Sequence, residues 1–113
     1  RALGLFSRIG ERYEIYVENM LPYGACLAVL AHEYTHAWQA DQFHQETSLL
    51  WLEGLAEWIS YKTLVYYSYT KEAASIPLQK DIYGQGFQKI KSLEDRFGSK
   101  QVLEKVLQIV NGG

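Results

Sequence analysis

His32-Glu33-Tyr34-Thr35-His36 is the stretch on which the fold of this chain depends. Residues four apart on a helix are separated by about 40° around its axis, so the imidazoles of His32 and His36 can reach one metal ion. Glu33 lies about 100° further round, where it is poorly placed as a ligand but well placed to hold a water bound to that ion. The pattern predicts a helix, from about Tyr23 to Asp41, that carries two metal ligands and a general base.

A metal site of this kind needs a third ligand, and Glu53 is the best candidate. It falls in a second predicted helix, from Thr47 or Ser48 to near Tyr69, which is apolar almost all round and should be buried. A buried carboxylate is costly unless it meets a metal, a cation or hydrogen bonds. Two imidazoles and one carboxylate leave a fourth position open, as in catalytic zinc sites. We therefore expect one zinc ion per chain, bound by His32, His36 and Glu53.

Glu57 lies one turn beyond Glu53 on the same predicted helix. Zinc-bound imidazoles usually donate their other N–H to a carboxylate, and we expect Glu57 to serve His32 in this way. The reverse assignment, with Glu57 as the ligand, stays open. His44 is an alternative third ligand, but it is two residues late for the metzincin spacing and is more typical of a solvated loop. Gly54, next to Glu53, should let its helix approach the first helix closely.

Together these residues resemble the gluzincin metallopeptidases, in which the Glu of a Glu-Gly pair is the third zinc ligand. The closest likeness is to the peptidase domain of the plant organ-size regulators, which are ubiquitin-regulated and also carry LIM segments. The shared motifs are Ala-His-Glu-x-x-His-Ala-Trp at 31–38, the step to Glu53-Gly54, and Tyr-Gly-x-Gly-Phe at 83–87. They span about residues 25–97. The single cysteine, Cys26, excludes a LIM module within this chain.

The resemblance implies a role for Tyr83, which matches the tyrosine that stabilises the oxyanion in the aminopeptidase branch. A phenol near the metal can donate a hydrogen bond to the developing negative charge. Four other tyrosines are alternatives for this role: Tyr61, Tyr66, Tyr67 and Tyr69.

Composition narrows the partners of the chain. A formal net charge of -2 gives no electrostatic reason to expect nucleic acid or an acidic membrane as a partner. No apolar run is long enough to cross a bilayer, and a single cysteine suits a reducing compartment, so a cytoplasmic protein is expected. The expected partner is a peptide or protein substrate, and the oligomeric state is left open.

The expected fold is a single domain over residues 1–113, of the α+β class and mostly helical. A β-hairpin is predicted from Ala2–Phe6 and Tyr13–Val17 around a turn at 8–11, and Pro22 suits the first turn of the active-site helix. About three further helices should follow, at 47–69, 78–97 and 99–110, with a loop at 70–77. On the active-site helix, the residues expected to face the core are Leu27, Leu30, Ala31 and Tyr34.

The predicted reaction is metal-assisted hydrolysis of a peptide bond. Zinc lowers the pKa of its bound water towards ~7, and Glu33 takes the proton as the water attacks the carbonyl. The exposed edge of the Tyr13–Val17 strand is expected to bind an extended peptide. Two other functions compete with this hypothesis. One is a zinc-stabilised binding module without turnover, against which an intact Glu33 argues. The other is a helical interaction domain without metal, which leaves the converging polar residues unexplained.

Overall fold

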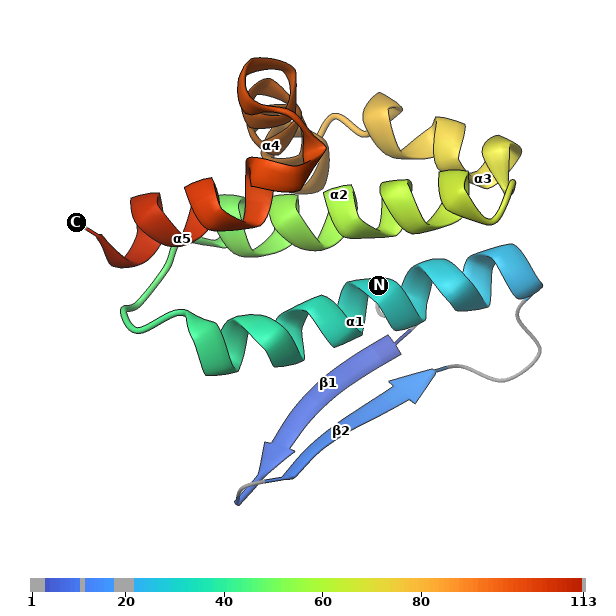
Figure 1. The fold of residues 1–113 in the computed structure, drawn as a ribbon. Coiled ribbons are helices and arrows are strands. Elements are labelled where there is room, and N and C mark those ends of the chain that lie inside the picture. The colour runs from blue at the N-terminus through green and yellow to red at the C-terminus, as the bar shows by residue number, and fades with distance from the viewer. Residues whose placement is uncertain (1–3, 11, 18–21, 113) are drawn as a thin grey trace.

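The computed structural model of the chain describes residues 4–10, 12–17 and 22–112. Its hairpin, long antiparallel helix pair and shorter C-terminal helices are drawn in Figure 1. The elements follow one another as β1 (Gly4–Ile9), β2 (Arg12–Val17), α1 (Tyr23–Gln42), α2 (Leu49–Tyr66), α3 (Thr70–Ser75), the 3-10 turn η1 (Ile76–Leu78), α4 (Ile82–Phe97), the 3-10 turn η2 (Ser99–Gln101) and α5 (Val102–Asn111). In the described ranges, no helix is both long and apolar enough to span a membrane.

The two strands form an antiparallel pair that packs against α1. Pairing runs from Gly4 opposite Val17 to Ile9 opposite Arg12, and Gly10 takes a left-handed φ of 62° in the connection. The first strand therefore continues past Phe6, where the sequence analysis ended it, and the turn is tighter than predicted. A positive φ is easily reached by glycine, which lets the chain reverse directly after Ile9.

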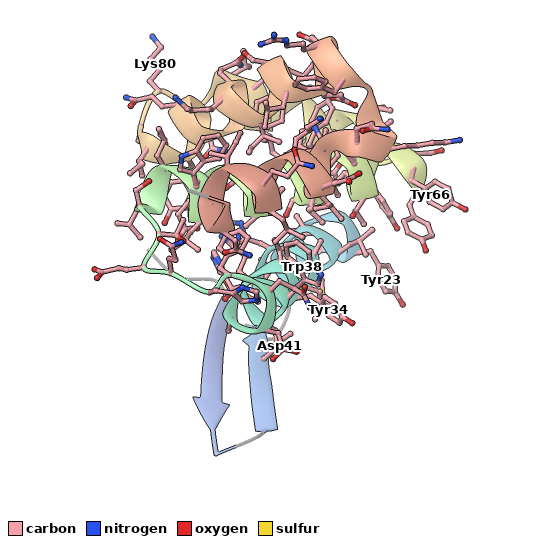
Figure 2. All side chains as sticks on the ribbon, turned by 60° about the vertical axis from the view of Figure 1, so that its left-hand side comes forward. Tyr23, Tyr34, Trp38, Asp41, Tyr66 and Lys80 are labelled. Carbon is pink, nitrogen blue, oxygen red and sulfur yellow. The ribbon has the colours of Figure 1, made fainter. Side chains whose placement is uncertain are left out.

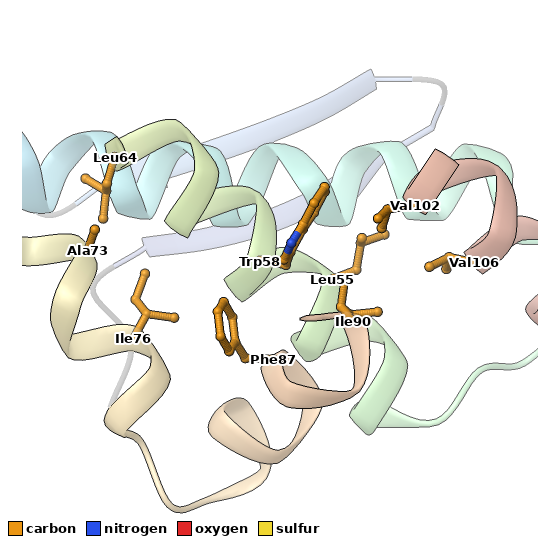
Figure 3. Packing of buried hydrophobic residues seen from close by; sticks show 9 residues of the cluster. All are labelled: Leu55, Trp58, Leu64, Ala73, Ile76, Phe87, Ile90, Val102 and Val106. Atoms are coloured by element: carbon orange, nitrogen blue, oxygen red, sulfur yellow. The ribbon is translucent and has the colours of Figure 1, made fainter. Parts of the chain in front are cut away.

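Among the residues that the structure describes, the core cluster is built from helical side chains. Figure 3 shows nine buried side chains from α2, α3, η1, α4 and α5 packed together, while α1 lies between α2 and the hairpin in Figure 1. These core residues are Leu55, Trp58, Leu64, Ala73, Ile76, Phe87, Ile90, Val102 and Val106. The expected α+β class is therefore corrected. The packed body that carries the site is all-helical, and the hairpin contributes none of these core residues.

The expectation of three helices after α1 was also wrong, because four are present. Residues 70–77, predicted as a loop, form α3 and the start of η1, with Ala73 and Ile76 buried in the core. The next helix begins at Ile82 rather than Leu78. Asp81 caps it by accepting hydrogen bonds from the backbone N–H groups of Tyr83 at 3.1 Å and Gly84 at 3.4 Å. This side-chain cap satisfies N–H groups that have no partner within the helix.

The face of α1 that turns inward matches the predicted one only in part, because Leu27 packs against the core as expected but two of the other predicted residues do not. Leu30 and Tyr34 remain 42% and 69% exposed, and Figure 2 shows Tyr34 pointing away from the helical body. The residues of α1 that are buried are Gly24, Thr35 and Gln39. The inward face of α1 is therefore rotated from the predicted one and includes the polar side chains of Thr35 and Gln39, which hydrophobic periodicity does not identify.

Candidate metal centre

Three side chains from α1 and α2 converge on one point. His32 and His36 lie one turn apart on α1, and Glu53 faces them from α2. Glu53 Oε1 lies 2.8 Å from His32 Nε2 and 3.1 Å from His36 Nε2. The two imidazole rings meet edge to face, with their centroids 4.8 Å apart. The structure thus brings together the three residues that the sequence analysis named as metal ligands.

The donor atoms of this cluster lie close enough together to hold a single metal ion. One ligand atom from each of the three residues lies within 4.8 Å of the other two. Tetrahedral zinc with bonds of about 2.0–2.1 Å has neighbouring ligand atoms roughly 3.3 Å apart. The contacts of Glu53 Oε1 with the two imidazoles are already close to that spacing. Two imidazole nitrogens and one carboxylate oxygen are also the donor set of catalytic zinc sites that keep a fourth position open.

Hydrogen bonds between these residues set their charges in the metal-free cluster. Burial alone would raise the pKa of Glu53, but hydrogen bonds with His32 and His36 outweigh burial and lower that pKa to about 2. Burial alone would lower the pKa of His36, yet hydrogen bonds with Glu53 and Gln39 raise it. Glu53 is therefore ionised at neutral pH, and the same hydrogen bonds favour the protonated form of His36.

Glu33 stands beside the cluster without joining the three converging ligands. It follows His32 on α1, so its side chain leaves the helix about 100° away from that imidazole. Its negative charge contributes to the raised pKa values of both His36 and Tyr83. Glu33 thus lies near enough to both His36 and Tyr83 for its charge to act on each of them.

Tyr83, at the start of α4, approaches the same site, so that α4 joins α1 and α2 around it. The centroid of its ring lies 6.1 Å from that of His32. Burial, followed by the negative charges of Glu53 and other carboxylates, raises the pKa of Tyr83 above its ordinary value. The phenol therefore keeps its proton at neutral pH and can donate it in a hydrogen bond.

The other tyrosines considered for this role have different surroundings. Tyr66 and Tyr67 pack edge to face against each other with ring centroids 4.9 Å apart, and Tyr66 points outward in Figure 2. The ring of Tyr61 packs against Phe87, 5.3 Å between centroids, and Tyr69 packs against the core. Of the five tyrosines, Tyr83 is the one with a ring contact to a histidine of the cluster.

Glu57 lies on the His32 side of the site, as the sequence analysis expected, but it does not hydrogen-bond that imidazole. The distance from Glu57 Oε1 to His32 Nδ1 is 3.8 Å, which is too long for a hydrogen bond. Burial raises the pKa of Glu57, although the charge of His32 and a hydrogen bond with Gln79 oppose it. Glu57 is therefore a weaker partner of His32 than predicted, and Glu53 is the better placed of the two carboxylates to bind a metal.

Gln39 is a residue of the site that sequence reasoning missed. It is 2% exposed, and its Oε1 lies 2.8 Å from His36 Nδ1. Its Nε2 donates a 2.9 Å hydrogen bond to the backbone carbonyl of Leu52, next to Glu53 on α2. The available signal was position alone, since Gln39 follows His36 by three residues and shares its helix face.

Gly54 has a different role from the one predicted. A Cβ added there would lie 2.4 Å from the backbone oxygen of Gly86, so Gly54 allows α2 to approach α4 rather than α1. The reciprocal Cβ at Gly86 would lie 2.6 Å from Gly54 Cα. This glycine crossing fixes α4 against α2 immediately beside Glu53, and it positions the turn that carries Tyr83.

A cavity of about 450 Å³ opens on the other side of the site, beside His36 and Glu53. Apolar side chains of Ala40, Phe43 and Leu52 contribute to its walls. Its volume lies within the range of small-molecule and side-chain pockets. His44 is not part of the converging group: it is exposed, and its backbone N–H donates to Asn111 Oδ1 at 2.8 Å.

No family model, curated protein or solved structure matches this chain.

Proposed function

We propose that this chain is a zinc-dependent peptidase of the gluzincin type. The observation that carries the proposal is the convergence of His32 and His36 of α1 with Glu53 of α2, with Glu33 and Tyr83 at its margins. A zinc ion that merely tied helices together would normally be closed by four protein ligands, whereas this cluster offers three and leaves one position open. The additional carboxylate and phenol are the groups that peptide hydrolysis requires.

The roles of the protein groups follow from their chemistry. Bound zinc supplies a Lewis acid that makes a water nucleophilic at neutral pH. Glu33 accepts the proton of the attacking water and later passes it to the departing amine. The Tyr83 hydroxyl donates a hydrogen bond to the carbonyl oxygen as negative charge develops there.

A peptide or protein is the proposed substrate. The cavity beside His36 and Glu53 offers space for one substrate side chain, and its Ala40, Phe43 and Leu52 walls favour an apolar one. An extended segment of substrate lying across the site would then present its carbonyl between Glu33 and Tyr83.

One observation favours a second candidate, a zinc-binding module that does not turn over substrate. Glu53 Oε1 is hydrogen-bonded by both imidazoles, so the cluster already connects α1 to α2 as a structural site would. In that case the charge of Glu33 would be dispensable.

The test is metal analysis of the purified protein together with cleavage of a random peptide library. Glu33→Gln keeps the shape of the side chain and removes the proton acceptor. It should bind zinc like the wild type and lose activity by about 10²–10⁴-fold. Glu104→Gln, the same change at an exposed position of α5, should keep full activity.

Zinc binding without cleavage by the wild type would favour the binding module. Absence of zinc binding would overturn both candidates. Equal activity of Glu33→Gln and the wild type would remove Glu33 from the mechanism.

A further inference from the structure

The surroundings of the two histidines differ in a way that gives Gln39 a role. His32 Nδ1 has a carboxylate oxygen of Glu57 at 3.8 Å, whereas His36 Nδ1 has Gln39 Oε1 at 2.8 Å. Only the second distance is that of a hydrogen bond. The imidazole with the tighter outer contact is thus held by a neutral, buried amide rather than by an acid.

The direction of the hydrogen bonds around Gln39 follows from the groups involved. The backbone carbonyl of Leu52 can only accept a hydrogen bond, so the amide nitrogen of Gln39 must face it, at 2.9 Å. The amide oxygen is then left to face His36, and an oxygen of this kind only accepts. The proton between the two side chains must therefore belong to His36 Nδ1. His36 Nε2, the atom that points at Glu53, is then the nitrogen that would bind a metal in exchange for its own proton.

Burial makes this arrangement restrictive. Gln39 is 2% exposed, and a buried amide that gives up either hydrogen bond is left without the partner that compensates for its desolvation. Rotating the amide by half a turn would set its nitrogen against the imidazole and its oxygen against the Leu52 carbonyl, losing both bonds. The Leu52 carbonyl belongs to the residue before Glu53, so one side chain connects two of the three converging residues.

We propose that Gln39 is a positioning residue of the metal site. Its hydrogen bond with His36 Nδ1 fixes the imidazole with Nε2 toward the metal. Its hydrogen bond to the Leu52 carbonyl holds α2 in the register that places Glu53 beside the same metal. This inference rests on the proposed zinc site. It adds a residue that is not one of the three converging ligands and acts through His36, although its side chain also lies in the wall of the adjoining cavity.

The structure offers a matched control for a merely structural role. Ser60 of α2 is also 2% exposed, and its Oγ donates a 2.9 Å hydrogen bond to the backbone carbonyl of Ala28 on α1. Like Gln39, Ser60 is a buried polar side chain that ties the same two helices through a carbonyl. Unlike Gln39, its hydrogen bond does not involve an imidazole.

The experiment compares Gln39→Met, Gln39→Glu and Ser60→Ala with the wild type by chelator competition for zinc, by thermal unfolding, and by NMR detection of the His36 Nδ1–H in the zinc-loaded protein. Gln39→Met keeps the length of the side chain and removes both hydrogen bonds. It should weaken zinc binding about 10–100-fold, as loss of such outer partners does. It should also speed solvent exchange of the Nδ1–H.

Ser60→Ala should lose stability while keeping the zinc affinity and the slow exchange of the wild type. Gln39→Glu retains an acceptor for the Nδ1–H and should restore zinc binding to within a few-fold of the wild type.

Each outcome decides a point. Equal zinc affinities of Gln39→Met and Ser60→Ala would overturn the positioning role and leave the zinc site standing. Failure of Gln39→Glu to restore binding, in a variant that folds, would show that the acceptor for His36 is not the feature that matters. A wild-type protein without zinc affinity would overturn the proposed function and this inference together.

Discussion

Replacing Gly86 by alanine should separate α2 from α4 and destabilise the protein. A Cβ at position 86 would lie 2.5 Å from the Leu50 backbone oxygen, 2.6 Å from Gly54 Cα and 2.8 Å from Gly54 N. Non-bonded carbon atoms prefer about 3.5–4.0 Å, so the two helices must move apart by roughly 1 Å. The obstructing atoms are backbone atoms of α2 and cannot turn aside as a flexible side chain does.

The magnitude follows from two opposing effects. Overpacking of this kind costs about 1–3 kcal/mol. Alanine recovers up to ~1 kcal/mol through its better helix propensity. The net loss should be about 1–2 kcal/mol, and a loss of that size lowers the melting temperature of a domain this small by roughly 4–12 °C. Because Phe87 and Ile90 of α4 belong to the core, their packing should loosen as well.

Urea denaturation of Gly86→Ala, with Gly24→Ala as its control, measures this effect. Gly24 is also a buried helical glycine, but a Cβ there would meet only the carboxylate end of Glu72, a flexible side chain that can move away. Gly24→Ala should therefore stay within about 0.5 kcal/mol of the wild type. Equal unfolding midpoints for the two variants would refute the conclusion that the glycine crossing controls the approach of α4 to α2.

Three further predictions concern single side chains. Glu53→Ala should abolish stoichiometric zinc binding, whereas Glu57→Gln should weaken it about tenfold, because Glu53 contacts both imidazoles and Glu57 lies 3.8 Å from one. Chelator competition measures both zinc affinities. Zinc retained in Glu53→Ala but lost in Glu57→Ala would reverse the assignment. Tyr83→Phe should lower kcat and kcat/KM together by about 10²–10³-fold with zinc content unchanged; a change confined to KM would argue against oxyanion stabilisation. Glu94 accepts hydrogen bonds from Lys62, Ser99 and Trp58 that outweigh burial and lower its pKa to about 2. Its ionised form stabilises the fold above the unfolded-state pKa near 4.5 and loses that effect as pH falls towards 2. Glu94→Gln should therefore cost about 1 kcal/mol at pH 7, after allowance for solvent screening of Lys62, and progressively less below pH 4.5; a constant difference across the titration would contradict this.

The candidate site could be anticipated from sequence largely because its parts are local. The spacing of His32 and His36 fixes their relative positions on any helix. A carboxylate such as Glu53 in an apolar helix is costly to bury unless it meets a metal, a cation or hydrogen-bond donors. Short-range periodicity thus identified chemistry-bearing residues that the fold then gathered. The meeting of α4 with the site was a different matter. It depended on the likeness of Tyr83 and its glycines to a known motif, since no local rule says which helices will touch.

The remaining differences arise where tertiary contacts outweigh local preference. Residues 70–75 lack a strong helical pattern, yet burial of Ala73 stabilises a short helix there. The Asp81 side chain caps α4, which therefore starts at Ile82 rather than at the predicted Leu78. Its hydrogen bond with the Tyr83 N–H replaces the backbone hydrogen bond that a longer helix would make there. The hairpin was expected to be part of an α+β core, but among the described residues the core cluster consists of helical side chains alone.

The rotation of α1 away from part of its predicted face has a physical cause that links the fold to the site. Hydrophobic periodicity assumes that a helix docks through its apolar side, and here Leu30 and Tyr34 lie outside. Part of what holds α1 to α2 is polar: Ser60 to the Ala28 carbonyl, Gln39 to the Leu52 carbonyl, and the two imidazoles to Glu53. Such bonds contribute little net stability when formed but are expensive to leave unmade once buried. They therefore specify the register of α1 on α2 more strongly than apolar contacts would, and that register is what brings the two histidines level with Glu53.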